Sequence, residues 1–95
     1  MLTSADIREM SPNKLISWFM IASYAYYHLD TQVMSDYDFD FLTVRIKNNW
    51  ESIDHPHKSL IKKTNLDSST GYDIDYPTIV KGATVDFLNK NNIVF

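Results

Sequence analysis

Residues 24–40 of this chain read YAYYHLDTQVMSDYDFD, and this stretch decides how the chain folds. It joins the aromatic end of one helical pattern to the acidic, aromatic start of another through a short turn. If the two helices fold back on each other, flat rings and carboxylates converge on one small surface. The stretch therefore predicts a helical hairpin that carries an aromatic and acidic surface.

The first helix of the hairpin is predicted over residues 11–29. Ser11 can cap the free amides of its first turn, and Pro12 fits the first helical position. Apolar residues recur at helical spacing, namely Leu15, Trp18, Phe19, Ala22, Tyr26 and Leu29. The opposite face is only half polar. This helix must therefore be central to the fold or covered by a partner, which includes a second copy in a homodimer.

The second helix is predicted over residues 35–53. The Ser35 hydroxyl can cap the amide of Asp38, and the Asp38 carboxylate can reach back, as in a capping box. The core stripe consists of Phe39, Leu42, Ile46, Trp50 and Ile53. Asp36 and Asp40 share another face, where two carboxylates four residues apart repel each other. The positive end of the helix softens that repulsion only in the first turn.

The rest of the chain completes a single domain over residues 1–95. A short helix is expected near residues 4–10. Residues 61–95 are predicted to form a loop followed by a C-terminal helix at about 77–90, which completes the core. The apolar end, Ile93-Val94-Phe95, is expected to dock onto the domain. The predicted fold class is all-α, a small helical bundle built on two main antiparallel helices.

Composition excludes several classes of protein. A hydrophobic fraction of 44% and an aromatic fraction of 14% are those of a folded globule. The absence of cysteine excludes disulfides and thiolate metal sites, and it favours a reducing, cytoplasmic setting. A formal charge of −3 argues against nucleic-acid binding. No apolar stretch is long enough for a membrane span, so we expect no membrane partner.

Several residues and short motifs occur in a characteristic order along the chain. They are Tyr26-Tyr27, Asp30, Asp36, Phe39-Asp40, the run 42–50 and His55-Pro56. This series resembles the small N-terminal helical (Ia-type) domain of NAD-dependent bacterial DNA ligases. That domain captures the nicotinamide mononucleotide (NMN) half of NAD. The resemblance runs without a gap from Tyr24 to Trp50, and it assigns residues 11–60 to a ligase-like helical pair.

The resemblance implies a set of ligand-binding residues. Tyr26 and Phe39 would stack on the two faces of the nicotinamide ring, and Asp36 and Asp40 would contact the ribose and the amide. Tyr27 stands where the family often has a histidine near the phosphate. The chain departs from the family at two of these positions, because Phe39 lacks a hydroxyl and Tyr27 cannot become a cation. NMN or NAD is the implied ligand, and no cofactor is required.

The same comparison argues against an enzyme. A ligase needs a nucleophilic lysine in a Lys-x-Asp-Gly setting, and this chain has no such motif. We therefore predict no catalytic residues and no metal site, although His55 and His57 flank a proline and could hold a metal if a third ligand were present. Free-standing relatives of the domain resemble small bacteriophage proteins, which implies a viral factor in the host cytoplasm.

Three functions stay open. The first is a protein-interaction module, whose partner is a host enzyme or a second copy of the chain. The second is a stand-alone module that binds NMN or NAD through the residues above. The third is an acidic mimic of nucleic acid, which the interspersed lysines disfavour. Each signal also has a structural explanation: Tyr26 and Phe39 can be core rings, Asp36 suits a helix start and Asp30 suits a turn. Asp40 is the hardest to explain by structure alone.

Overall fold

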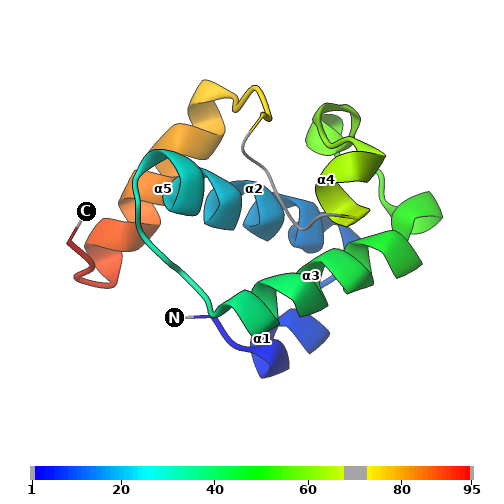
Figure 1. Cartoon of the computed structure of the whole chain (residues 1–95), viewed down its shortest axis with the longest axis horizontal. Helices are drawn as coiled ribbons and strands as arrows, with labels where there is room; N and C mark the ends of the chain where they lie inside the picture. Colours follow the sequence, from blue (N-terminus) through cyan, green and yellow to red (C-terminus); the bar gives the residue numbers. More distant parts are fainter. Residues whose placement is uncertain (1, 68–72, 95) are drawn as a thin grey trace.

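The computed structural model describes residues 2–67 and 73–94, and these are all-α, as predicted. Figure 1 shows the arrangement of the elements. In chain order they are α1 (Ser4–Arg8), α2 (Pro12–His28), α3 (Asp36–Asn48), the 3₁₀ helices η1 (Trp50–Ser52) and η2 (Pro56–Leu60), α4 (Lys63–Asp67) and α5 (Thr78–Lys90).

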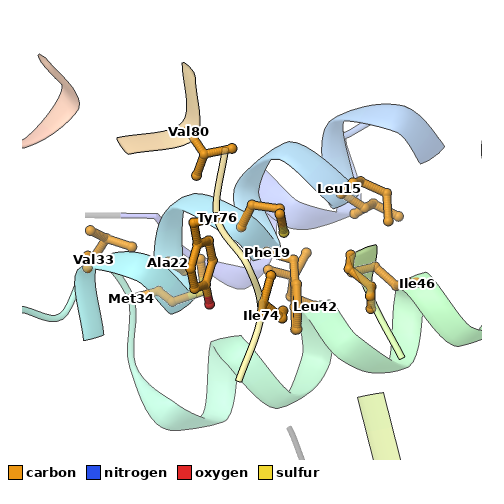
Figure 2. Packing of buried hydrophobic residues seen from close by; sticks show 14 of the residues in the cluster. Leu15, Phe19, Ala22, Val33, Met34, Leu42, Ile46, Ile74, Tyr76 and Val80 are labelled. Carbon is orange, nitrogen blue, oxygen red and sulfur yellow. The ribbon is translucent and has the colours of Figure 1, made fainter. Parts of the chain in front are cut away.

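Helix α2 runs through the middle of the molecule. It packs against α3 on one side and α5 on another, while α1 packs against α3 (Figure 1). The segment 73–77 covers a further part of α2, where Ile74 and Tyr76 join the buried cluster shown in Figure 2. Of the two explanations for a helix that is apolar nearly all round, the structure therefore supports the central position.

The start of α2 corrects one prediction. Ser11 occupies the N-cap position and Pro12 the first helical position, but the Ser11 side chain makes no capping hydrogen bond. The amide of Lys14 donates instead to the backbone carbonyl of Ser11 at 3.0 Å, which satisfies the donor that the hydroxyl was expected to serve. The complete capping box lies on α1, where Thr3 and Asp6 bond reciprocally.

Helix α3 starts as predicted but ends earlier. The Ser35 hydroxyl accepts from the Asp38 amide at 3.1 Å. The Asp38 carboxylate does not reach back, because it accepts a hydrogen bond from the Ser4 hydroxyl of α1. The α-helix ends at Asn48 rather than near residue 53. Asn49 stops it by donating its side-chain amide to the Arg45 carbonyl at 2.8 Å, and η1 follows.

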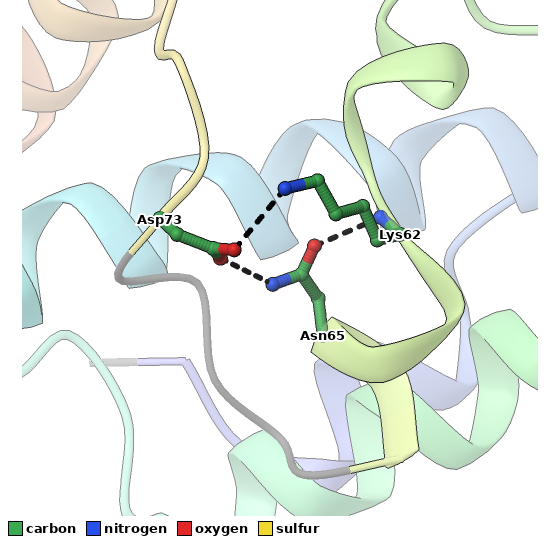
Figure 3. Close-up of polar contacts among 3 residues, drawn as sticks. All are labelled: Lys62, Asn65 and Asp73. Carbon is green, nitrogen blue, oxygen red and sulfur yellow. Dashed lines mark hydrogen bonds and ion pairs between the residues drawn. The ribbon is translucent and has the colours of Figure 1, made fainter.

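Helix α4 (Lys63–Asp67) was not predicted, because the chain from residue 61 to the C-terminal helix at about 77 was expected to be a loop. Figure 3 shows the contacts that hold it. The buried Asn65 side chain accepts from the Lys62 amide and donates to the Asp73 carboxylate, both at 2.8 Å. Lys62 also forms an ion pair with Asp73 at 3.2 Å. These bonds tie α4 to the segment before α5. Residues 67–71 have the composition of a turn or an exposed loop, and residues 68–71 lie outside the described residues.

Helix α5 spans Thr78–Lys90, close to the predicted 77–90. Its buried face packs on α2, and the Phe87 ring meets the Trp18 ring edge-on at 4.9 Å. The apolar end of the chain only partly docks. Ile93 packs against the core, but Val94 is 94% exposed, and Phe95 lies outside the described residues. No helix in the described part of the chain is long and apolar enough to cross a membrane.

Candidate ligand pocket between α2 and α3

The connection between α2 and α3 has a fixed path. Asp30 adopts a positive φ of 52°, and the Thr31 amide turns back to donate to the Ala25 carbonyl at 2.9 Å. Val33 and Met34 are buried, and the Val33 carbonyl accepts from the Leu2 amide at 3.1 Å. These anchors hold the end of α2 and the start of α3 in a defined relation.

A pocket of about 250 Å³ opens at this junction. It is lined by Ala22, Tyr26, Tyr27, Gln32, Val33, Met34, Asp36, Phe39 and Asp40. The structure thus brings all five predicted site residues, which are Tyr26, Tyr27, Asp36, Phe39 and Asp40, around one hollow. The other four lining residues were not predicted. Their role depends on the path of the connection and on the inward face of α2, which the motif does not specify.

The aromatic side chains of the pocket differ in how closely they pack against the core. Phe39 is half-buried, and its ring stacks on the fully buried Phe19 ring with centroids 5.4 Å apart and planes 20° apart. Tyr26 is 47% exposed, and its ring meets the Tyr27 ring edge-on at 4.9 Å. Phe39 is therefore held by the core, whereas Tyr26 is a large ring that the core does not cover. An exposed aromatic ring of this kind is available to a ligand.

The two carboxylates of the pocket also differ. Asp36, at the first position of α3, accepts from the Gln32 side-chain amide at 3.2 Å. Asp40 lies one turn further on and is exposed, and no described residue forms a hydrogen bond or ion pair with its carboxylate. Carboxylates accept hydrogen bonds and attract cations, so the pair can hold hydroxyl groups or positive charge.

A second, more polar hollow adjoins the pocket. It is lined by Tyr26, Asp30, Thr31 and Gln32, so it shares Tyr26 and Gln32 with the pocket. Asp30, which the sequence indicates as a turn residue, has the positive φ of a residue in a tight turn and also borders this hollow. The acidic character of the site therefore continues past Tyr26.

The histidines after α3 have a structural role. The His57 amide donates to His55 Nδ1 at 3.0 Å, so His55 carries its proton on Nε2, which lies 3.1 Å from the Ser17 hydroxyl. Burial, and then the neighbouring His57, lower the pKa of His55. Within residues 2–67 and 73–94, no group of three His, Cys, Asp or Glu side chains could hold a metal ion.

No family model, curated protein or solved structure matches this chain in the comparisons made. The likeness to the ligase domain rests on the residues quoted above and stays a prediction. What the structure adds is the position of those residues around a common pocket.

Proposed function

We propose that this protein is a non-catalytic binding module that takes a nicotinamide nucleotide of the NMN or NAD type in the pocket between α2 and α3. One observation carries the proposal: the residues singled out by the ligase resemblance come from two helices and line the same pocket. The hairpin brings the end of α2 and the start of α3 together, and the resemblance assigns a ligand-binding role to the rings and carboxylates that they carry.

The chemistry of the pocket fits the nicotinamide riboside portion of such a ligand. The oxidised nicotinamide ring is flat and positively charged, which suits an exposed ring such as Tyr26 and a carboxylate such as Asp40. The ribose hydroxyls are donors for Asp36 and Asp40. The volume of about 250 Å³ lies just below the range of about 300–1,000 Å³ that is typical of small-molecule sites. A pocket of that size suits a ring and a sugar rather than a whole dinucleotide.

An NMR titration of the whole protein with NMN, and then with NAD, tests the proposal. We expect saturable shifts centred on Tyr26, Asp36, Phe39 and Asp40. The double variant Asp36→Ala/Asp40→Ala should abolish these shifts, whereas Glu51→Gln, an exposed carboxylate beyond the far end of α3, should leave them unchanged. The proposal would be contradicted if millimolar ligand caused no shift, or if the double variant bound the ligand as well as the wild-type protein does.

A protein-interaction module remains the second candidate, and the outer face of α3 favours it. Tyr37 is 77% exposed and Val44 is 48% exposed, and a spacing of seven residues places them on the same face of the helix. Exposed aromatic and aliphatic side chains on one helix face are typical of protein contact surfaces. The partner would be a host enzyme, if the protein is viral, or a second copy of the chain.

Sedimentation velocity over a range of concentrations tests the self-association form of this candidate. If copies pair through α3, the wild-type protein should form a dimer that Tyr37→Glu/Val44→Glu dissociates. Ile79→Glu, on the exposed face of α5, is the matched control and should leave the dimer intact. A protein that stays monomeric at every concentration would exclude self-pairing.

A further inference from the structure

The charge of the pocket sets which of the nicotinamide compounds it binds most tightly, and this inference rests on the proposed function. The lining includes two carboxylates, Asp36 and Asp40, and no lysine, arginine or histidine among the residues that the structure describes there. The adjoining hollow adds a third carboxylate, Asp30. A ligand in this pocket therefore meets only negative formal charge from the lining side chains.

The basic side chain nearest in sequence packs elsewhere. His28 stacks on Tyr24 and meets Tyr76 edge-on, with both ring centroids 5.4 Å away. Tyr24 lies on the part of α2 that the 73–77 segment covers, Tyr76 lies in that segment, and neither ring lines the pocket. His28 is thus committed to a different face of the helix from Tyr26.

The arginines near α3 are also engaged away from the pocket. Arg8 places its guanidinium over the Phe41 ring, 5.6 Å from the centroid. Arg45 donates to the carbonyls of Met10 and Arg8 at 3.3 and 3.5 Å. Both contacts link α3 to the N-terminal segment, and neither arginine is among the lining residues. A phosphate in the pocket would find no arginine within this lining.

The positive end of α3 does not replace a cationic side chain. A helix N-terminus attracts anions, but here the carboxylates of Asp36 and Asp38 already stand in the first turn. The Ser35 hydroxyl also takes the Asp38 amide. A phosphate monoester, which carries a charge of about −1.5 to −2 near pH 7, would add to this negative charge rather than balance it.

We propose that the pocket selects a phosphate-free, cationic aromatic nucleoside, an N-ribosylated pyridinium, over its 5′-phosphate. The positive ring lies against Tyr26 and Phe39 and within reach of the two carboxylates, while the ribose hydroxyls donate to them. The 5′ position carries a hydroxyl. Attraction between the ring and the carboxylates is then not offset by repulsion between a phosphate and the same carboxylates.

Isothermal titration calorimetry on the whole protein tests this selectivity with three probes. These are nicotinamide riboside, its 5′-phosphate NMN, and the reduced riboside, whose ring is uncharged. We expect the oxidised riboside to bind at least tenfold more tightly than either of the others at low salt. The preference over NMN should shrink as salt is added, because exposed charges are screened.

Two variants of one residue at the edge of the pocket test the effect of charge, because one adds a positive charge and the other does not. Gln32 is exposed, so Gln32→Lys and Gln32→Met should both fold, and only the first adds a cation. Gln32→Lys should shift the affinity ratio of NMN to riboside toward NMN by at least tenfold, and Gln32→Met should not shift it.

The outcomes separate the two proposals. If NMN binds as tightly as the riboside or more tightly, the proposed function stands and the selectivity is overturned. If the reduced riboside binds as well as the oxidised one, the role of ring charge is overturned. If no probe binds at millimolar concentration, both proposals fail.

Discussion

At the scale of single residues, Asp40 is the feature of the pocket that structure alone explains least. It lies in the second turn of α3, where the favourable field of the helix N-terminus has faded. Asp36, four residues earlier, repels it. Its carboxylate forms no hydrogen bond or ion pair with any residue in 2–67 or 73–94 that would offset this cost. A side chain that destabilises its own helix is typical of a residue kept for binding.

We expect Asp40→Asn to raise the free energy of unfolding by about 0.2–0.5 kcal/mol, since the substitution removes a like-charge pair at helical spacing. Urea denaturation of the two proteins measures the difference. The same substitution should weaken ligand binding. A loss of more than about 1 kcal/mol in stability would mean that the Asp40 carboxylate has a structural partner, and the binding interpretation would lose its main support.

The pocket shows how far single residues can be predicted from sequence. Tyr26, Phe39 and the two aspartates were predicted because their order along the chain resembles a known domain. Gln32 was not predicted, because its position depends on the left-handed turn at Asp30 and on the anchoring of Val33. Such a path is set by contacts with distant segments, here the Leu2 amide, and not by local pattern.

At the scale of elements, two serines with the same sequence signal behave differently. Ser35 caps α3 through its hydroxyl, whereas Ser11 precedes α2 and makes no side-chain capping bond. The difference arises because the backbone carbonyl of Ser11 accepts the amide that the hydroxyl would have accepted. A serine before a helix therefore predicts where the helix starts better than it predicts the bond at that start.

Ser35 and Ser11 offer a matched test of side-chain capping. Ser35→Ala should lower the free energy of unfolding by about 1 kcal/mol, because it leaves the Asp38 amide without its acceptor. Ser11→Ala should change the stability by less than about 0.5 kcal/mol, since no side-chain bond is lost. Chemical denaturation measures both. Equal losses in the two variants would contradict the assigned bonds.

The three larger helices and the short helix α1, expected near residues 4–10, could be predicted, whereas the end of α3 and the presence of α4 could not. Helices α2 and α5 follow the predicted bounds because hydrophobic periodicity and proline mark their starts. Helix α3 ends early because the Asn49 side chain takes the Arg45 carbonyl, which periodicity does not reveal. Helix α4 is only five residues long and depends on Asn65 meeting Asp73, a contact between segments. Elements of this size owe their existence to tertiary contacts.

At the scale of the whole molecule, side-chain bonds fasten the polypeptide that connects α3 to α5. His55, next to Ser17 of α2, anchors the segment after η1, and Asn65 with Lys62 anchors Asp73 before α5. Hydrogen bonds from Asn65 and then from Lys62 lower the pKa of Asp73. Protonation of His55 weakens the first anchor, and protonation of Asp73 weakens the second. The stability of the whole domain therefore depends on pH.

We expect the free energy of unfolding to fall as the pH is lowered from about 8 to about 5. The pKa of His55 is 6.5 in the unfolded chain and lower in the folded protein. Between these two values the unfolded state binds more protons, so acid favours unfolding, and the effect levels off below the folded pKa. Asp73 adds a further loss when the pH falls below 3.8 toward its lowered folded pKa.

Urea denaturation at a series of pH values measures this dependence, and His55→Asn is the informative variant. An asparagine side chain can accept the His57 amide as the ring nitrogen does, but it does not titrate. The variant should therefore lose most of the slope between pH 8 and pH 5. His57→Asn should keep a reduced slope, because His57 is the second cause of the lowered pKa. A wild-type protein with constant stability over this range would refute the prediction.

The lining of the pocket lies within a single run of the chain, from Ala22 to Asp40, while α5 packs onto α2 from more than fifty residues away. Short loops close at a lower entropic cost than long ones, so contacts between residues close in sequence tend to form early in folding. The hairpin can thus reach its native shape before the C-terminal helix arrives. A ligand that binds the hairpin would then stabilise the folding transition state as well as the native state. Such a ligand would increase the refolding rate and not only decrease the unfolding rate.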